Sequence, residues 1–155
     1  MTGQAIVIGI GNLDRGDDAV GVQVARRVAA LRPDVRLVEI DHPSDALNAW
    51  TPEDTVVVVD AVSTDGDPGD IHVFDVVARN LPAGSWSAGG THALGLAAVV
   101  ELARALGQLP RRLMVVGVEA AQFDHGAPTS TAVAAAVPTA AVAVITAIDD
   151  AEGEP

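Results

Sequence analysis

The feature that most constrains this chain is a glycine-rich turn near its start, which joins a short apolar segment to an amphipathic one. The turn has the sequence Gly9-Ile10-Gly11-Asn12-Leu13-Asp14-Arg15-Gly16-Asp17-Asp18. Residues 5–8 before it predict a buried strand, and residues 18–31 after it predict a helix. A strand, a tight turn and a helix in this order are typical of the first unit of an α/β domain.

This turn does not fit a dinucleotide-binding site. That motif places a third glycine three residues after the second, where this chain has Asp14. Asp17 and Asp18 would also repel a pyrophosphate, which binds at a helix N-terminus. Acidic side chains in the turn favour a cation instead. One of the two aspartates is expected to cap the helix and the other to be available for a site, and the residues alone do not decide which.

Composition narrows the classes of function. The chain has 155 residues and a net charge of −12, which argues against nucleic acid as a partner. None of its nine basic residues is a lysine, which excludes Schiff-base chemistry. Cysteine is absent, which excludes disulfides, a thiol nucleophile and cysteine-bound iron–sulfur clusters. No apolar run is expected to span a membrane and no secretory signal is visible, so the expected compartment is the cytoplasm.

The remaining segments predict a three-layer α/β/α sandwich with a mostly parallel five-stranded sheet that contains one antiparallel strand. The further strands are expected at residues 35–40, 55–62, 71–76 and 113–118. The further helices are expected at residues 45–50, 93–106 and 131–148, the last kinked or split by Pro138.

The connection before residue 71 is too short for a parallel crossover, so the strand that follows it is expected to be antiparallel and near an edge of the sheet. We expect one domain over residues 1–148 and a flexible acidic tail over residues 149–155.

Three acidic residues follow predicted strands. In a flavodoxin-like strand order, ligands bind in the crevice where the order reverses, between the first and third strands. Asp18 lies just beyond the first strand and Asp60 ends the third, so both are expected to face this crevice. Asp60 is otherwise a turn residue that ends a strand, but its place in the crevice favours a function. Asp41 and His42 end the second strand and are candidates to line the same crevice.

His92 follows a Gly/Ser-rich stretch and precedes a predicted helix. A lone histidine is more often structural, but an imidazole and two carboxylates together match the ligands of a divalent metal. His72 is expected to be structural, and His125 is a weaker candidate. There is no His-Glu-x-x-His motif, and residues 85–89 lack the first glycine and the preceding strand of a serine nucleophile elbow.

Several segments together resemble the hydrogenase maturation protease family, whose members remove a C-terminal extension from the large-subunit precursor of nickel–iron hydrogenases. The segments are Gly9-Ile10-Gly11-Asn12, Asp17-Asp18-Ala19-Val20-Gly21, Val59-Asp60-Ala61, Thr91-His92-Ala93-Leu94-Gly95-Leu96 and the likeness of residues 113–119 to the family's final strand. The resemblance implies a mixed sheet, with one antiparallel strand, between layers of helices.

The resemblance also implies a set of metal contacts, namely Asp18, Asp60 and His92, and so decides between Asp17 and Asp18. The resemblance further implies that the metal is nickel, which would arrive already bound to the precursor. Asp18 and Asp60, with Asp41 as a helper, are then the candidates to activate water. Some relatives have Glu where this chain has Asp18. The family tends to have Asp-Gly-Gly-Thr where this chain has Asp41-His42-Pro43-Ser44.

Two other functions stay open at this point. A non-catalytic, metal-sensing chaperone would bind the precursor without cutting it. A stand-alone metallohydrolase for small substrates would bind metal tightly in the isolated protein.

Overall fold

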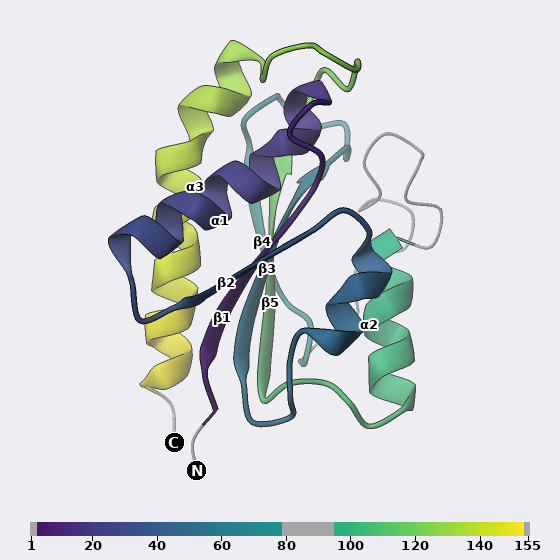
Figure 1. Cartoon of the computed structure of the whole chain (residues 1–155), viewed down its shortest axis with the longest axis vertical. Coiled ribbons are helices and arrows are strands. Elements are labelled where there is room, and N and C mark those ends of the chain that lie inside the picture. Colours follow the sequence, from purple (N-terminus) through teal and green to yellow (C-terminus); the bar gives the residue numbers. More distant parts are fainter. Residues whose placement is uncertain (1–2, 79–94, 154–155) are drawn as a thin grey trace.

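The computed structural model describes residues 3–78 and 95–153, and it confirms the predicted α/β sandwich (Figure 1). In this part of the chain, five strands form one mixed sheet with the order β2-β1-β3-β5-β4. The strands are β1 (Ala5–Ile10), β2 (Arg36–Ile40), β3 (Thr55–Val62), β4 (Ile71–Asp75) and β5 (Arg112–Glu119). The helices are η1 (Gly16–Ala19), α1 (Val20–Leu31), η2 (Pro43–Asn48), α2 (Gly95–Ala105) and α3 (Thr131–Glu152), where η marks a 3₁₀-helix.

Two apolar cores lie on opposite faces of the sheet. On one face Val24 of α1 and Val144 of α3 belong to the same buried cluster as Val57 of β3. On the other face Leu96 of α2 joins a cluster with Val58. Figure 1 shows α1 and α3 on one side of the sheet and α2 on the other. All eight residues of β3 are buried because both of its faces are covered, which explains its continuous β-branched run.

The strand order places the candidate crevice where the sequence predicts it. β1 pairs in parallel with β2 on one side and with β3 on the other, so the chain reverses its direction of progress across the sheet between β1 and β3. β4 pairs antiparallel with β5 and lies at the edge of the sheet, as its short connection predicts. The segments that follow β1 and end β3 therefore lie at the same end of the sheet.

Three boundaries differ from the prediction. The segment at residues 16–19 is a separate 3₁₀-helix, so α1 begins at Val20 rather than at Asp18. The short helix after β2 is also 3₁₀ and runs over Pro43–Asn48. α3 continues to Glu152 because Arg32 holds Asp149 at 2.8 Å and Ala151 is buried, so most of the predicted acidic tail is helical.

Two further expectations concern α3. The helix runs unbroken through Pro138, so of the two predicted outcomes it is not split, and Ala134, whose carbonyl the proline leaves without its usual donor, is exposed. The expectation that no apolar run is long enough to span a membrane is wrong for this helix, which meets that criterion by length and composition. Part of its surface is nevertheless buried in the core, through residues such as Val133 and Ile148.

Candidate active site

The glycine-rich turn is built so that the chain after β1 folds back closely onto η1. Gly11 has a φ of 148°, and a side chain there would overlap the backbone carbonyl of Asp18. Gly21, at the start of α1, faces the carbonyls of Ile10 and Val59, which leave no room for a Cβ. The absence of side chains at these positions brings η1 and α1 against the ends of β1 and β3.

The two adjacent aspartates of η1 have different environments, although both are buried. Asp17 accepts hydrogen bonds from the backbone N–H groups of Ala121 (2.8 Å), Gln122 (2.9 Å) and Ser130 (2.6 Å). The Ser130 hydroxyl donates a further hydrogen bond to it at 3.0 Å. Asp17 therefore uses its carboxylate to fasten the segment between β5 and α3, and it has a structural role.

Asp18 has only half of its carboxylate occupied. Its Oδ2 accepts a hydrogen bond from the backbone N–H of Asn12 at 2.9 Å, which fixes the glycine-rich turn. Its Oδ1 is buried and has no hydrogen-bond partner. The expectation that one aspartate caps the helix is wrong, because neither η1 nor α1 has a side-chain cap and Ala19 precedes α1.

Asp60 ends up next to Asp18, as the strand order predicts. Its side chain is 1% exposed, and neither of its carboxylate oxygens has a hydrogen-bond partner. Burial first, and the nearby negative charge of Asp18 second, raise the pKa of Asp60 well above its usual value, and the backbone N–H of Ala61, which lies near without hydrogen-bonding geometry, offsets this only in part. Asp18 and Asp60, called the acid pair below, are thus close enough to interact and hold three carboxylate oxygens without donors.

Buried carboxylate oxygens destabilise a folded chain when neither a hydrogen-bond donor nor a cation contacts them. A buried polar atom without a partner costs about 1–3 kcal/mol, and more if it is charged. A cation would satisfy all three oxygens and offset the repulsion between the two carboxylates. The residues present therefore fit a metal ion. Among the residues described, no group of three acidic or histidine side chains is close enough to hold a metal, so the acid pair alone is an incomplete set.

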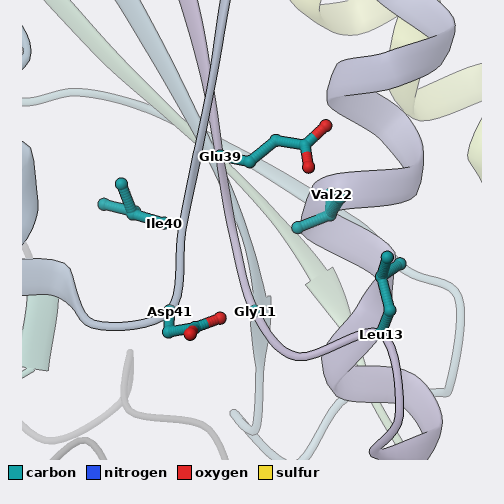
Figure 2. Close-up of a pocket in the computed structure, with 6 residues that line it drawn as sticks. All are labelled: Gly11, Leu13, Val22, Glu39, Ile40 and Asp41. Carbon is teal, nitrogen blue, oxygen red and sulfur yellow. The ribbon is translucent and has the colours of Figure 1, made fainter.

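The other predicted site residues have different positions. Asp41 is exposed at the end of β2, and together with Gly11 it lines a cavity of about 260 Å³ (Figure 2). This cavity, called the β2 pocket below, is also lined by Leu13, Val22, Glu39 and Ile40. Asp41 therefore lies beside the turn whose Asn12 N–H binds Asp18, and among the described residues it has no hydrogen bond to the acid pair. His92 and the Ser85–Gly89 segment lie outside the described residues.

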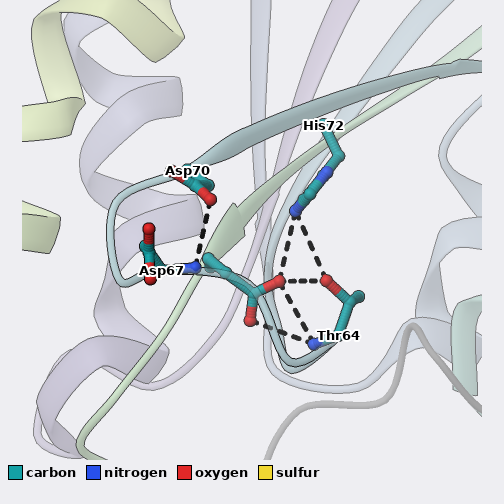
Figure 3. Close-up of polar contacts among 5 residues, drawn as sticks. Thr64, Asp67, Asp70 and His72 are labelled. Atoms are coloured by element: carbon teal, nitrogen blue, oxygen red, sulfur yellow. Dashed lines mark hydrogen bonds and ion pairs between the residues drawn. The ribbon is translucent and has the colours of Figure 1, made fainter.

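The remaining histidines form no part of the acid pair. His42 and His125 are exposed. His72 contacts the Glu119 carboxylate at 3.1 Å, which supports the structural role predicted for it. Thr64 also donates to Glu119 from its backbone N–H and its hydroxyl (Figure 3). Sequence reasoning missed this buried Glu119, although it lies near the C-terminal end of a buried strand, as Asp60 does.

Several solved structures of endopeptidases share this fold. The hydrogenase maturating endopeptidase HybD from E. coli has a TM-score of 0.78 at 24% identity, over 96% of this chain and 93% of that one. An endopeptidase from Escherichia coli, solved in solution, has a TM-score of 0.78 at 25% identity over 96% and 94%. The hydrogenase maturation protease HybD from Thermococcus kodakarensis has a TM-score of 0.71 at 24% identity over 92% and 97%. Comparison with curated protein sequences found no match.

A family model described as hydrogenase maturation protease matches residues 40–147. Because this match covers more than half of the chain, the chain belongs to the hydrogenase maturation protease family. Its activity class is therefore that of a maturation endopeptidase. The matched range contains Asp41, Asp60 and His92, whereas Asp18 lies before it.

Proposed function

We propose that this endopeptidase removes the C-terminal extension of a nickel–iron hydrogenase large-subunit precursor, in the cytoplasm, and that it acts on precursor that already carries nickel. Membership of the family supports the maturation reaction. The observation that supports recognition of a metal is the acid pair, with its three buried oxygens that accept no hydrogen bond. A cation would satisfy all three oxygens of such a pair, and nickel on the precursor supplies one.

In this proposal Asp18 and Asp60 contact the nickel of the precursor from one side, and His92 completes the set. The role of His92 comes from the family resemblance. The chemistry of the ligands supports it, because imidazole and carboxylate groups both bind divalent first-row transition metals such as nickel. Binding is then strongest when nickel is present, so the enzyme tests whether the precursor has been loaded.

The chemical step needs a water molecule that loses a proton as it attacks the scissile carbonyl. A carboxylate near that water accepts the proton, and the leaving amine later receives one. Asp60 and Asp18 are the candidates for this base, with Asp41 as a helper, and we therefore class the reaction as aspartic-type and metal-assisted. Nickel on the precursor would hold the scissile peptide in place, and this orientation would increase the rate of hydrolysis.

The decisive experiment compares nickel-loaded with nickel-free precursor, each incubated with the purified protein, and measures precursor mass before and after. We expect loss of the extension only from the loaded form. Asp60→Asn and His92→Ala should leave the loaded precursor uncut, whereas His125→Ala, an exposed histidine, serves as the matched control and should cut normally.

Three results would contradict the proposal. Equal cutting of the nickel-loaded and nickel-free precursors would contradict the proposal that the enzyme recognises nickel. Binding without any change in mass would instead identify a metal-sensing chaperone. Tight nickel binding by the isolated protein, with hydrolysis of small substrates, would identify a stand-alone metallohydrolase.

A further inference from the structure

We propose, resting on the function above, that the precursor binds as an added β-strand along the free edge of β2, with one side chain in the β2 pocket. The occupant is the extended stretch of precursor next to the bond that is cut. An extended peptide that joins a sheet edge gains main-chain hydrogen bonds, and a pocket beside that edge selects one of its side chains.

The first support is the position of β2. It is the terminal strand of the sheet, and among the described residues no strand pairs with its outer edge. In Figure 1, β2 crosses the front of the molecule between α1 and η2. Leu37 is 36% exposed, and both Arg36 and Glu39 are exposed. The strand therefore presents backbone that another extended chain can reach.

The second support is the direction of the β2 backbone groups. The carbonyl of Ile40 points to β1, because it accepts the Gly11 N–H at 3.0 Å. Backbone groups alternate in direction along a strand, so those of Val38 also point to β1, whereas those of Leu37 and Glu39 point outward. The N–H and C=O groups of Leu37 and Glu39 have no partner among the described residues.

The third support is continuity with the acid pair. The β2 pocket lies where β2 ends, since Glu39, Ile40 and Asp41 line it. Gly11 lines it from the opposite side, and the next residue, Asn12, donates its N–H to Asp18. Figure 2 shows Asp41 directed toward Gly11 across this space. A peptide that leaves the edge of β2 therefore passes the pocket and reaches the turn whose Asn12 is hydrogen-bonded to Asp18.

The other edge of the sheet lacks this arrangement. β4 is separated from β3, and so from Asp60, by β5. Of the residues described, those that line the pocket come from β2, α1 and the turns that follow β1 and β2, and none comes from β4. The cavity and the unpaired outward groups thus occur together at β2.

The test removes one outward-pointing N–H group of β2 and leaves the hydrogen bonds between β2 and β1 in place. Leu37→Pro removes the outward N–H and places a ring where the added strand would lie, and proline is tolerated on an edge strand. Leu37→Ala is the matched control, since it shortens the same side chain and keeps the N–H. With nickel-loaded precursor we expect KM to rise about tenfold or more for Leu37→Pro with kcat little changed, and to change less than about threefold for Leu37→Ala. Equal kinetics for the two variants would overturn the inference.

A second measurement needs no proline and covers the case in which Leu37→Pro fails to fold. Amide hydrogen exchange is followed in the wild-type protein, with and without a nickel-loaded precursor variant whose altered cleavage site is bound but not cut. We expect exchange at Leu37 and Glu39 to slow on binding, while exchange at Val38, already directed to β1, stays unchanged. No slowing would overturn the inference, and so would slowing without precursor at high protein concentration, which would point to a second copy of this chain.

The two proposals fail in distinguishable ways. If the wild-type protein does not cut any precursor, the proposed function falls and this inference falls with it. If the wild-type protein cuts, but Leu37→Pro behaves as Leu37→Ala or the outward amides are not protected, only the inference falls.

Discussion

Two groups of buried acidic side chains lie at the same end of the sheet, and their surroundings are opposite. The acid pair places Asp60 beside Asp18 with no donor for three of its oxygens. Glu119, on the adjacent strand, is 2% exposed but receives hydrogen bonds from Thr64 and contacts His72. Burial raises the pKa of Glu119, yet the hydrogen bonds of Thr64 and then His72 outweigh it, so its pKa lies below the usual value. The pKa of Asp60 is raised instead.

The difference teaches how to separate acids that hold the fold from acids that await a ligand. Asp60 of β3 pairs in register with Gly117 of β5, and Glu119 lies two residues after Gly117. Position in the sheet therefore does not distinguish Asp60 from Glu119. The number of donors does. A buried carboxylate with a full set of donors stabilises its surroundings, whereas one without donors is tolerated where a cation binds.

The largest expected effect contrasts these two acids in catalysis. Asp60→Asn should lower the rate of precursor cutting by about 100-fold or more, because the variant loses a charge that engages the metal or the attacking water. Glu119→Gln should lower it by no more than about threefold. The measurement is single-turnover cutting of nickel-loaded precursor, with folded protein confirmed by circular dichroism. Comparable losses in two equally folded variants would break the contrast.

The second effect tests the same rule on neighbouring residues of η1. Asp17→Asn should lower the free energy of unfolding by about 2–4 kcal/mol, because an amide cannot accept the hydrogen bonds of Ala121, Gln122 and Ser130 together. Asp18→Asn should change it by about 1 kcal/mol or less, because one amide oxygen still accepts the Asn12 N–H. Urea unfolding of both variants measures this, and a larger loss for Asp18→Asn would contradict it.

Much of the fold was accessible from the sequence because its signals are local. The β-branched run at residues 55–62 marked a strand covered on both faces, and the short connection before residue 71 marked an antiparallel strand. The end of α3 was not accessible in this way. It depends on Arg32, which holds Asp149 from a position 117 residues away.

The candidate site was predictable in position but not in detail. The rule for strand-order reversal predicted Asp18 and Asp60 at one end of the sheet, and the structure has them close enough to interact. The roles of Asp17 and Asp18 could not be separated from the residues alone, because the donors to Asp17 lie 104 to 113 residues away. Glu119 gave the same signal as Asp60, an acid that ends a buried strand, and its partners Thr64 and His72 are contacts made only in the folded chain. The place of His92 in the site stays a prediction.

A third effect is the pH dependence of stability, measured by thermal unfolding in buffer with chelator. The raised pKa of Asp60 means that the folded state holds its proton to higher pH than the unfolded state, so stability falls as pH rises above about 4. The free energy of unfolding of Asp60→Asn should therefore exceed that of the wild type by on the order of 1 kcal/mol at pH 7. This difference should vanish toward pH 4.

Glu119 should show the opposite sign, since its pKa is lowered. Its contribution is present above the unfolded pKa and is lost as pH falls through the folded one, so the deficit of Glu119→Gln should shrink in acid. Parallel pH profiles for the two variants would remove the proposed difference between the acids.

The smallest effect concerns how much of the Glu119 environment depends on His72. His72→Ala should lower the free energy of unfolding by about 1 kcal/mol, the usual contribution of one hydrogen bond, because Thr64 still donates to Glu119. Precursor cutting should stay within about twofold of the wild type, since His72 belongs to the satisfied group and not to the acid pair. His125→Ala, an exposed loop change, should alter neither quantity and serves as the control. A loss of cutting in His72→Ala without a loss of stability would mean that the Glu119 group serves the reaction, and the distinction between the two groups would then have to be drawn elsewhere.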